Sequence, residues 1–126
     1  MRENIKDVAR KTKEASYFLA NASSLSKNQF LLQLADNLER EEEEIKEENK
    51  RDLEKAKSMG MKPSLLDRLE LSSSRIKAMA SGLREVANLP DPVGEVIEGS
   101  KRPNGLLITK VRVPLGVVAI IYEARP

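Results

Sequence analysis

The sequence predicts an α/β protein with a helical amino-terminal part, then a β-hairpin, then the first strand of a buried sheet. Three observations support this fold class. Apolar residues recur at helical spacing as far as Leu89. After Pro92 the pattern changes to strand-like alternation broken by turn residues. Residues 117–122 are apolar without interruption, which is typical of a strand buried on both faces.

The first half of the chain contains the clearest helical patterns. One amphipathic helix is expected from about Asn4 to Ala20. A connector follows, and Ser26 with Gln29 forms a capping-box pattern that predicts the start of a second helix. We expect Asn49 or Asp52 to interrupt or restart that helix.

Turn and cap residues set the ends of the later helices. Gly60 is suited to a helix end, because glycine accepts the left-handed conformation found there. Pro63 is expected to open a short helix as its first residue. The three serines 72–74 offer caps for the next helix, which Leu89 and the prolines at 90 and 92 should end.

The carboxyl-terminal third is predicted to be β-structure. Residues 93–99 and 107–113 should pair as a hairpin, because the Arg-Pro-Asn-Gly sequence at 102–105 favours a tight turn. Residues 113–116 form a second predicted turn before the apolar run. Parallel neighbours need crossover connections of about a dozen residues or more. The predicted strand at 117–122 therefore has no downstream partner in this chain.

Composition excludes several classes of function. The 126 residues include no cysteine and no histidine, which excludes disulfides, thiolate zinc sites, cysteine nucleophiles and histidine bases. A net charge of +2 and 3% aromatic residues do not favour nucleic-acid binding. No apolar run is long enough for a membrane span, and the first residues lack the apolar core of a signal peptide. We therefore expect a cytoplasmic protein without nucleic-acid or membrane partners.

Charge is unevenly distributed along the chain. Residues 39–55 contain nine acids and five bases, a net charge of −4. We interpret the acidic run 39–48 as the solvated face of a helix rather than a cation site, because no glycine turn gathers its carboxylates. Residues 101–126 have five bases and one acid, a net charge of +4. This end can attract an anionic molecule, but ordinary edge charge is the favoured interpretation for every basic residue except Arg125.

Four stretches together resemble one enzyme family. Residues 110–126, which read KVRVPLGVVAIIYEARP, closely resemble a stretch of the glutamate-5-semialdehyde dehydrogenases (gamma-glutamyl phosphate reductases) of the aldehyde dehydrogenase superfamily. Three further segments agree in order and spacing, namely 48–53 (ENKRDL), 66–69 (LDRL) and 89–96 (LPDPVGEV). The similarity extends over almost the whole chain.

The resemblance implies a domain organisation. Family members are about three times as long, so this chain is expected to be an amino-terminal portion that ends after the first buried strand. Residues 1–92 would form the helical part of the nucleotide-binding domain. Residues 93–113 would be a hairpin resembling the superfamily's oligomerisation region. Residues 114–126 would be the first buried strand of the nucleotide-binding sheet, truncated.

The resemblance also implies an activity. The family reduces L-glutamyl 5-phosphate to L-glutamate 5-semialdehyde with NADPH, releases phosphate, and serves L-proline biosynthesis, and its members are expected to be homo-oligomers. In the superfamily a cysteine thiolate attacks the acyl carbon. This chain has no cysteine, so no residue in it is assigned a catalytic role and the chain alone is expected to be inactive. Residues that would distinguish NADPH from NADH are expected beyond Pro126.

Six residues are candidates for cofactor binding because they follow the predicted strand: Ile121, Tyr122, Glu123, Ala124, Arg125 and Pro126. An ungapped match places Arg125 where many aldehyde dehydrogenases have an oxyanion-binding asparagine, but the reductases depart from that pattern. Arg125 can bind a phosphate of substrate or cofactor with two hydrogen bonds, or pair with a carboxylate and order the turn. The sequence leaves both roles open.

A second function from a different class also fits these residues. The unpaired apolar strand and the amphipathic helices would suit a non-enzymatic interaction module that adds a strand to the sheet of a partner.

Overall fold

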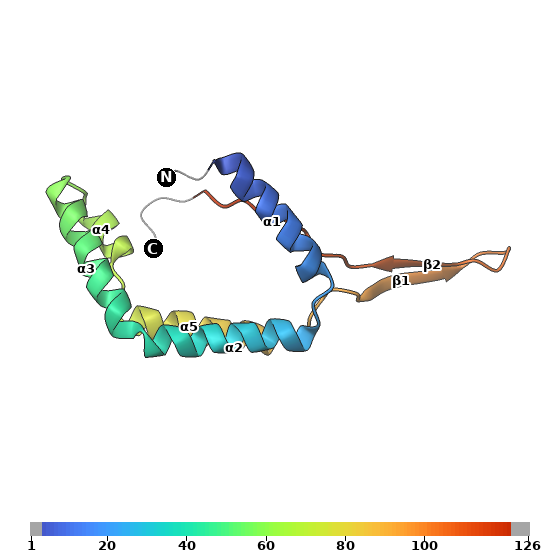
Figure 1. The fold of residues 1–126 in the computed structure, drawn as a ribbon. Coiled ribbons are helices and arrows are strands. Elements are labelled where there is room, and N and C mark those ends of the chain that lie inside the picture. Colours follow the sequence, from blue (N-terminus) through green and yellow to red (C-terminus); the bar gives the residue numbers. More distant parts are fainter. Residues whose placement is uncertain (1–3, 122–126) are drawn as a thin grey trace. The chain divides into compact units, whose positions relative to one another are not determined.

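The computed structural model describes residues 4–121, and this part of the chain divides into two compact units (Figure 1). Unit 1 comprises residues up to 24 together with 90–119, and unit 2 comprises residues 25–89 together with those from 120 onward. Five helices precede a two-stranded antiparallel sheet among the described residues. The elements are α1 (Ile5–Ala20), α2 (Ser24–Arg40), α3 (Glu42–Ser58), α4 (Pro63–Leu69), α5 (Ser73–Ala87), β1 (Val96–Lys101) and β2 (Leu107–Val111).

Helix α1 has the extent expected from its amphipathic pattern. Its amino-terminal cap is Asn4, whose side-chain oxygen accepts a hydrogen bond of 3.1 Å from the backbone N–H of Lys6. Such a cap satisfies a donor that the first helical turn leaves without an intrahelical partner. None of the residues of α1 is buried, although its apolar stripe is well defined.

The second predicted helix is two helices. Helix α2 begins at Ser24, two residues before the predicted cap. The interruption between the two helices is at Glu41 rather than at Asn49 or Asp52. Asn49 lies within α3 and is buried there, and its side chain bonds to backbone groups outside its own helix. Because the amide has these distant partners, it does not compete with the hydrogen bonds of α3.

The predicted helix ends around α4 are confirmed. Gly60 has a φ of +74°, and the N–H groups of Gly60 and Met61 bond to the carbonyls of Lys57 and Ala56. This pair of bonds is the Schellman arrangement that closes helix α3. Pro63 is the first residue of α4, and Ser72 caps α5 by accepting a hydrogen bond from the N–H of Arg75.

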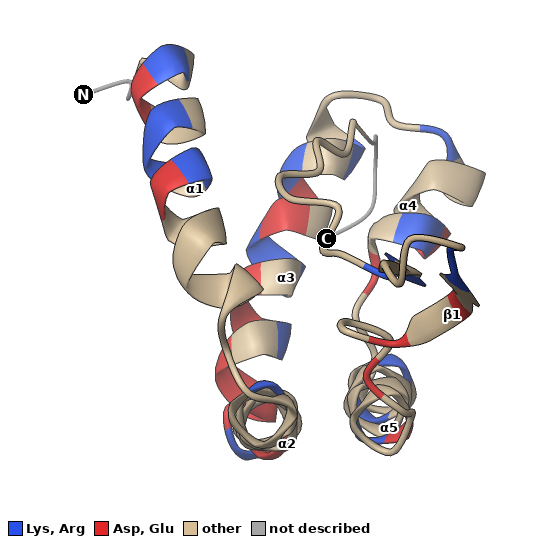
Figure 2. Cartoon of the chain, turned by 90° about the vertical axis from the view of Figure 1, so that its right-hand side faces the viewer, with Lys and Arg blue, Asp and Glu red and all other residues tan. Residues whose placement is uncertain are grey.

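Unit 2 contains the core. Its buried residues are mostly alanines, and Ile76 is the largest side chain that is completely buried. Helices α2 and α5 lie side by side (Figures 1 and 2). Arg84 of α5 also joins them, with ion pairs of 2.8 Å to Asp36 and 2.7 Å to Glu39 of α2. The buried residues are Ala35, Asn49, Ala56, Ile76, Ala80 and Ala87.

Strands β1 and β2 form the predicted hairpin. The turn is closed by hydrogen bonds from the N–H of Gly105 to the carbonyl of Arg102 (2.9 Å) and from the N–H of Arg102 to the carbonyl of Leu106 (2.8 Å). Gly105 has a φ of +88°, which glycine adopts without steric cost. A bulge at Ile97 interrupts the register between Val96 and Glu98. Every residue of both strands is exposed.

The strand predicted at 117–122 is not formed over its described part. Residues 112–121 belong to neither helix nor strand, and Tyr122 lies outside the described residues. A strand is held by hydrogen bonds to a neighbouring strand. Among residues 4–121, β1 and β2 pair only with each other, so the run at 117–121 has no neighbour. Residues 117–121 thus form no strand in the described part of the chain, and the assignment of this run to a buried strand of a larger sheet stays a prediction.

Candidate functional site

The predicted cofactor-binding residues lie at the edge of the described structure. Ile121 is the last described residue, and its side chain is 100% exposed. Tyr122, Glu123, Ala124, Arg125 and Pro126 lie outside the described residues. Only Ile121 of the six residues can therefore be placed, and their role stays a prediction.

The hairpin holds the start of the segment that leads to them. The pairing of β1 and β2 continues beyond Val96 through hydrogen bonds between Arg112 and the backbone of Gly94 (3.0 Å) and Glu95 (2.9 Å). The Arg112 side chain also forms an ion pair of 2.7 Å with Glu95. Gly94, with a φ of +89°, makes the turn by which the chain enters the first strand. Residues 113–121 therefore extend from an anchored hairpin end.

A second set of contacts ties the entry to the hairpin to Ser24, the first residue of α2. Asp91 accepts a hydrogen bond from the N–H of Val93 (3.0 Å) and another from the hydroxyl of Ser24 (2.8 Å). An aspartate that bonds the backbone two residues later stabilises a turn. The Leu-Pro-Asp-Pro sequence at 89–92 thus ends α5 and also positions the entry to the hairpin within unit 1.

The charges of the hairpin support ordinary surface roles. Arg112 is paired with Glu95, and Lys110 stands opposite Glu98 in the strand register. Cross-strand pairs of opposite charge stabilise a hairpin modestly. Two basic residues of the hairpin, Lys110 and Arg112, thus have acidic neighbours on the opposite strand or just before it. This arrangement is compatible with the interpretation of these residues as ordinary surface charges.

Unit 2 presents a shallow groove with a largely acidic lining. The groove, of about 380 Å³, is lined by four carboxylates, those of Glu41, Glu44, Glu48 and Asp52. Figure 2 shows acidic residues crowded along α3. Such a surface repels phosphate-bearing ligands. No group of carboxylates among residues 4–121 is arranged to hold a metal ion.

The acidic run itself is a helix surface crossed by local ion pairs. Lys46 lies 2.8 Å from Glu43, and Arg51 lies 3.0 Å from Glu47 and 2.6 Å from Glu48. Pairs separated by three or four residues lie on the same face of a helix. The hydrogen bond to Glu43 is the main reason why the pKa of Lys46 is raised. These contacts agree with the interpretation of residues 39–48 as a solvated face.

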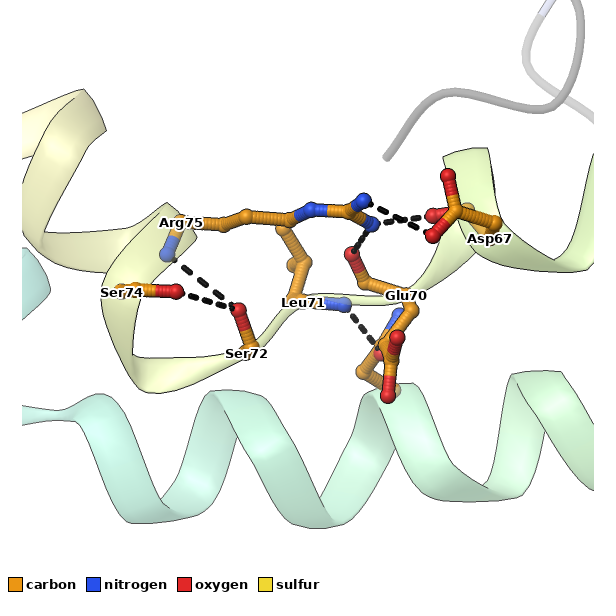
Figure 3. Close-up of polar contacts among 7 residues, drawn as sticks. Asp67, Glu70, Leu71, Ser72, Ser74 and Arg75 are labelled. Carbon is orange, nitrogen blue, oxygen red and sulfur yellow. Dashed lines mark hydrogen bonds and ion pairs between the residues drawn. The ribbon is translucent and has the colours of Figure 1, made fainter.

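A polar corner, which no local pattern in the sequence predicts, joins α3, α4 and α5 (Figure 3). The side chain of the buried Asn49 donates to the carbonyl of Leu69 (2.9 Å) and accepts from the N–H of Leu71 (2.7 Å). A side-chain amide can satisfy both groups because it has a donor and an acceptor. Asn49 thus fixes the connector between α4 and α5 to α3.

Arg75 completes the corner from the other side. Its guanidinium donates to the backbone carbonyls of Asp67 and Glu70, the latter at 2.8 Å, and to the carboxylate of Asp67 at 3.0 Å (Figure 3). The last carbonyls of a helix lack intrahelical donors, and an arginine can supply them. The corner therefore gives structural roles to Asn49 of the segment 48–53 and to Asp67 and Leu69 of the segment 66–69.

Comparison with known proteins defines the class of the chain. No model of a known protein family matches it. Curated relatives and solved structures do match, and they belong to one class, the reductases. The chain spans about 30% of the length of the curated relatives.

These relatives carry one name. The chain is 52% identical over 98% of its length to a gamma-glutamyl phosphate reductase of Carboxydothermus hydrogenoformans, and 52% identical over its whole length to that of Syntrophomonas wolfei. The crystal structure of the Thermotoga maritima reductase matches 89% of this chain and 27% of that protein, with a TM-score of 0.85 and 42% identity. The Saccharomyces cerevisiae reductase matches with a TM-score of 0.81 and 33% identity, covering 86% of this chain and 28% of the other.

The chain thus corresponds in sequence and fold to the amino-terminal portion of the gamma-glutamyl phosphate reductase family, as its four matching segments predicted. Among residues 4–121, the structure contains no helix with the length and apolar character of a transmembrane span.

Proposed function

We propose that this chain supplies the amino-terminal part of a gamma-glutamyl phosphate reductase. The supporting observation is identity of 52% over 98% of the chain, together with a shared fold at a TM-score of 0.85. The complete protein would reduce L-glutamyl 5-phosphate to L-glutamate 5-semialdehyde and release phosphate, in L-proline biosynthesis. Its expected location is the cytoplasm, and its expected state is a homo-oligomer.

This chain would contribute ligand-binding and structural residues to that reaction, but not the nucleophile. It has no cysteine, so the thiolate that attacks the acyl carbon would come from sequence outside these 126 residues. When bound, NADPH would supply the hydride. The segment 121–126 would lie along the cofactor, after a hairpin held by Arg112 and Glu95. Arg125 would bind phosphate or order the turn.

The alternative of a non-enzymatic interaction module is less well supported. The matching curated relatives are named as reductases, and identity extends through both units rather than over the helices alone. An interaction module would not need the segment after the hairpin to retain a reductase sequence.

A fusion protein tests the proposal. This chain would replace the matching 30% of the Carboxydothermus hydrogenoformans reductase. We expect the fusion to form NADPH from glutamate-5-semialdehyde, phosphate and NADP, which is the reverse reaction, and to use NAD less well. The matched control carries alanine in place of the nucleophilic cysteine in the part of the fusion that comes from the Carboxydothermus hydrogenoformans reductase. A folded but inactive fusion, measured beside the active parent enzyme, would refute the proposal.

Two variants of this fusion resolve the role of Arg125. If the guanidinium binds phosphate, Arg125→Gln should raise the KM for phosphate or for NADP by about tenfold or more, and Arg125→Lys should restore part of the loss. If Arg125 only orders the turn, both KM values should stay unchanged while thermal stability falls.

A further inference from the structure

The turn of the hairpin contains an asparagine that is followed by a glycine. Of the seven asparagines in the sequence, only Asn104 has this neighbour. Asn104 and Gly105 are both exposed, and among the described residues no atom beyond the chain neighbours lies within 4 Å of a Cβ built at Gly105. The backbone nitrogen of Gly105 is thus next to the side-chain amide of Asn104, and Gly105 has no side chain to hinder a close approach.

The turn also orients and polarises this side-chain amide. Oδ1 of Asn104 accepts a hydrogen bond of 3.2 Å from the N–H of Leu106, which holds the side chain beside the main chain. A donor at this oxygen stabilises the negative charge that develops there when a nucleophile attacks Cγ. The N–H of Gly105 donates to the carbonyl of Arg102 (2.9 Å), and this bond has to open before the nitrogen can react. Because the turn is exposed, water can replace the lost partner.

We propose that Asn104 is a modification site, at which attack by the backbone nitrogen of Gly105 converts the side-chain amide to a carboxylate. The nitrogen gives its proton to hydroxide and forms a bond to Cγ of Asn104. The Cγ–Nδ2 bond then breaks, Nδ2 takes up a proton from water, and ammonia leaves, so that a cyclic imide remains. Water opens this ring on either side of the nitrogen. Opening at Cγ gives aspartate, and opening at the backbone carbonyl carbon of Asn104 gives isoaspartate.

The two products differ in their consequences for the hairpin. Both place a negative charge near Lys101 and Arg102 in the sequence. Aspartate keeps a side-chain oxygen that can accept from the N–H of Leu106, and it leaves the main chain unchanged. Isoaspartate adds a methylene group to the main chain, so the hydrogen bond that closes the turn at Gly105 loses its geometry. Isoaspartate, but not aspartate, therefore loosens the pairing of β1 and β2.

The test incubates the 126-residue chain at mildly alkaline pH and follows each asparagine by proteolysis and mass spectrometry. Asn88 is the internal control, because it is also exposed and the N–H of the next residue, Leu89, likewise bonds to the carbonyl three residues earlier. We expect Asn104 to react at least about tenfold faster, since the side chain of Leu89 hinders the approach at Asn88. Both aspartate and isoaspartate should form at 104. Equal rates at the two asparagines would overturn the proposal, and so would aspartate as the sole product, which indicates direct hydrolysis.

Two variants sharpen the test. Asn104→Gln keeps a side-chain amide but needs a larger ring, so conversion at position 104 should slow by about tenfold or more. Asn104→Asp supplies the aspartate product directly, and the backbone amides of β1 and β2 should exchange with deuterium as slowly in this variant as in the original chain. In the purified isoaspartate form they should exchange several-fold faster. Unslowed conversion of Asn104→Gln would contradict attack by Gly105, and unchanged exchange in the isoaspartate form would contradict the loosening of the hairpin.

Discussion

The two units of the chain have similar local order but differ in burial. Unit 2 contains all the buried residues of the described chain, among them Ile76 and Ala80, and its helices are joined by specific polar contacts. Unit 1 has a capped helix and a registered hairpin but no buried residue in its described part. Caps and turns therefore specify elements in both units, whereas a core forms only where the chain supplies both sides of a contact.

Helix α1 shows this difference most clearly. Its apolar residues follow helical spacing, and its cap at Asn4 is formed, yet Phe18 is 83% exposed. An amphipathic pattern tells which face of a helix is suited to burial. It does not tell whether the covering residues are in the same chain.

The largest expected effect concerns the core of unit 2. Ile76 is 1% exposed, so Ile76→Ala removes buried apolar groups and leaves a cavity, which costs about 2–5 kcal/mol. We expect a corresponding fall in the free energy of unfolding, measured by urea denaturation and circular dichroism. Ile5→Ala, at a position that is 81% exposed in unit 1, is the control and should cost less than about 0.5 kcal/mol. Equal losses would mean that the two units do not differ in packing.

The next effect concerns the polar corner. Asn49→Ala leaves the carbonyl of Leu69 and the N–H of Leu71 without their side-chain partner, and should lower the free energy of unfolding by about 1–3 kcal/mol. Asn37→Ala, at an exposed position in α2, should be nearly neutral. If Asn49→Ala were as well tolerated as the control, the corner would not contribute to the stability of unit 2.

Two glycines of unit 2 provide a matched pair with opposite signs. No atom lies within 4 Å of a Cβ built at either Gly60 or Gly82. Gly60 has positive φ, so Gly60→Ala should destabilise by about 1 kcal/mol through backbone strain. Gly82 lies inside α5, so Gly82→Ala should stabilise by roughly 0.5–1 kcal/mol. The two melting temperatures test this, and shifts of the same sign would contradict it.

Much of the fold could be predicted because its signals are local. Gly60, Pro63, Ser72 and Gly105 each satisfy or shape the backbone next to them, and each is found in its expected role. Asn49 could not be predicted, because its partners lie 20 and 22 residues away and nothing near it in the sequence identifies them. The run at 117–122 was assigned a strand from apolarity alone, but strand formation requires neighbours.

The candidate site was predicted from a family resemblance rather than from chemistry visible in the chain. Of its six residues only Ile121 is described, and no described group approaches it as a partner in a site. A cofactor site in an α/β sheet is formed by the ends of several strands. A chain whose described strands form a single hairpin cannot show that arrangement, whatever its similarity to complete enzymes.

The smallest expected effect concerns the ion pairs between α2 and α5. The pKa of Glu39 determines in which direction their stabilisation changes with pH. The hydrogen bond from Arg84 lowers that pKa below its ordinary value of 4.5, outweighing the opposing effect of burial. The folded state therefore binds a proton on Glu39 less readily than the unfolded chain does. Its stabilisation is present above the ordinary pKa and is lost as the pH falls through the lowered value.

Arg84→Met tests this contact because it keeps the aliphatic part of the side chain and removes both ion pairs. The melting temperature of the original chain should exceed that of the variant at pH 7. The difference should shrink as the pH falls from the ordinary pKa of Glu39 through the lowered one, because below the lowered pKa the carboxylate is protonated in both states. The difference should also be small, because ion pairs at exposed sites are screened by solvent. If the difference in melting temperature stayed constant at acid pH, the stabilisation would come from side-chain packing rather than from charge.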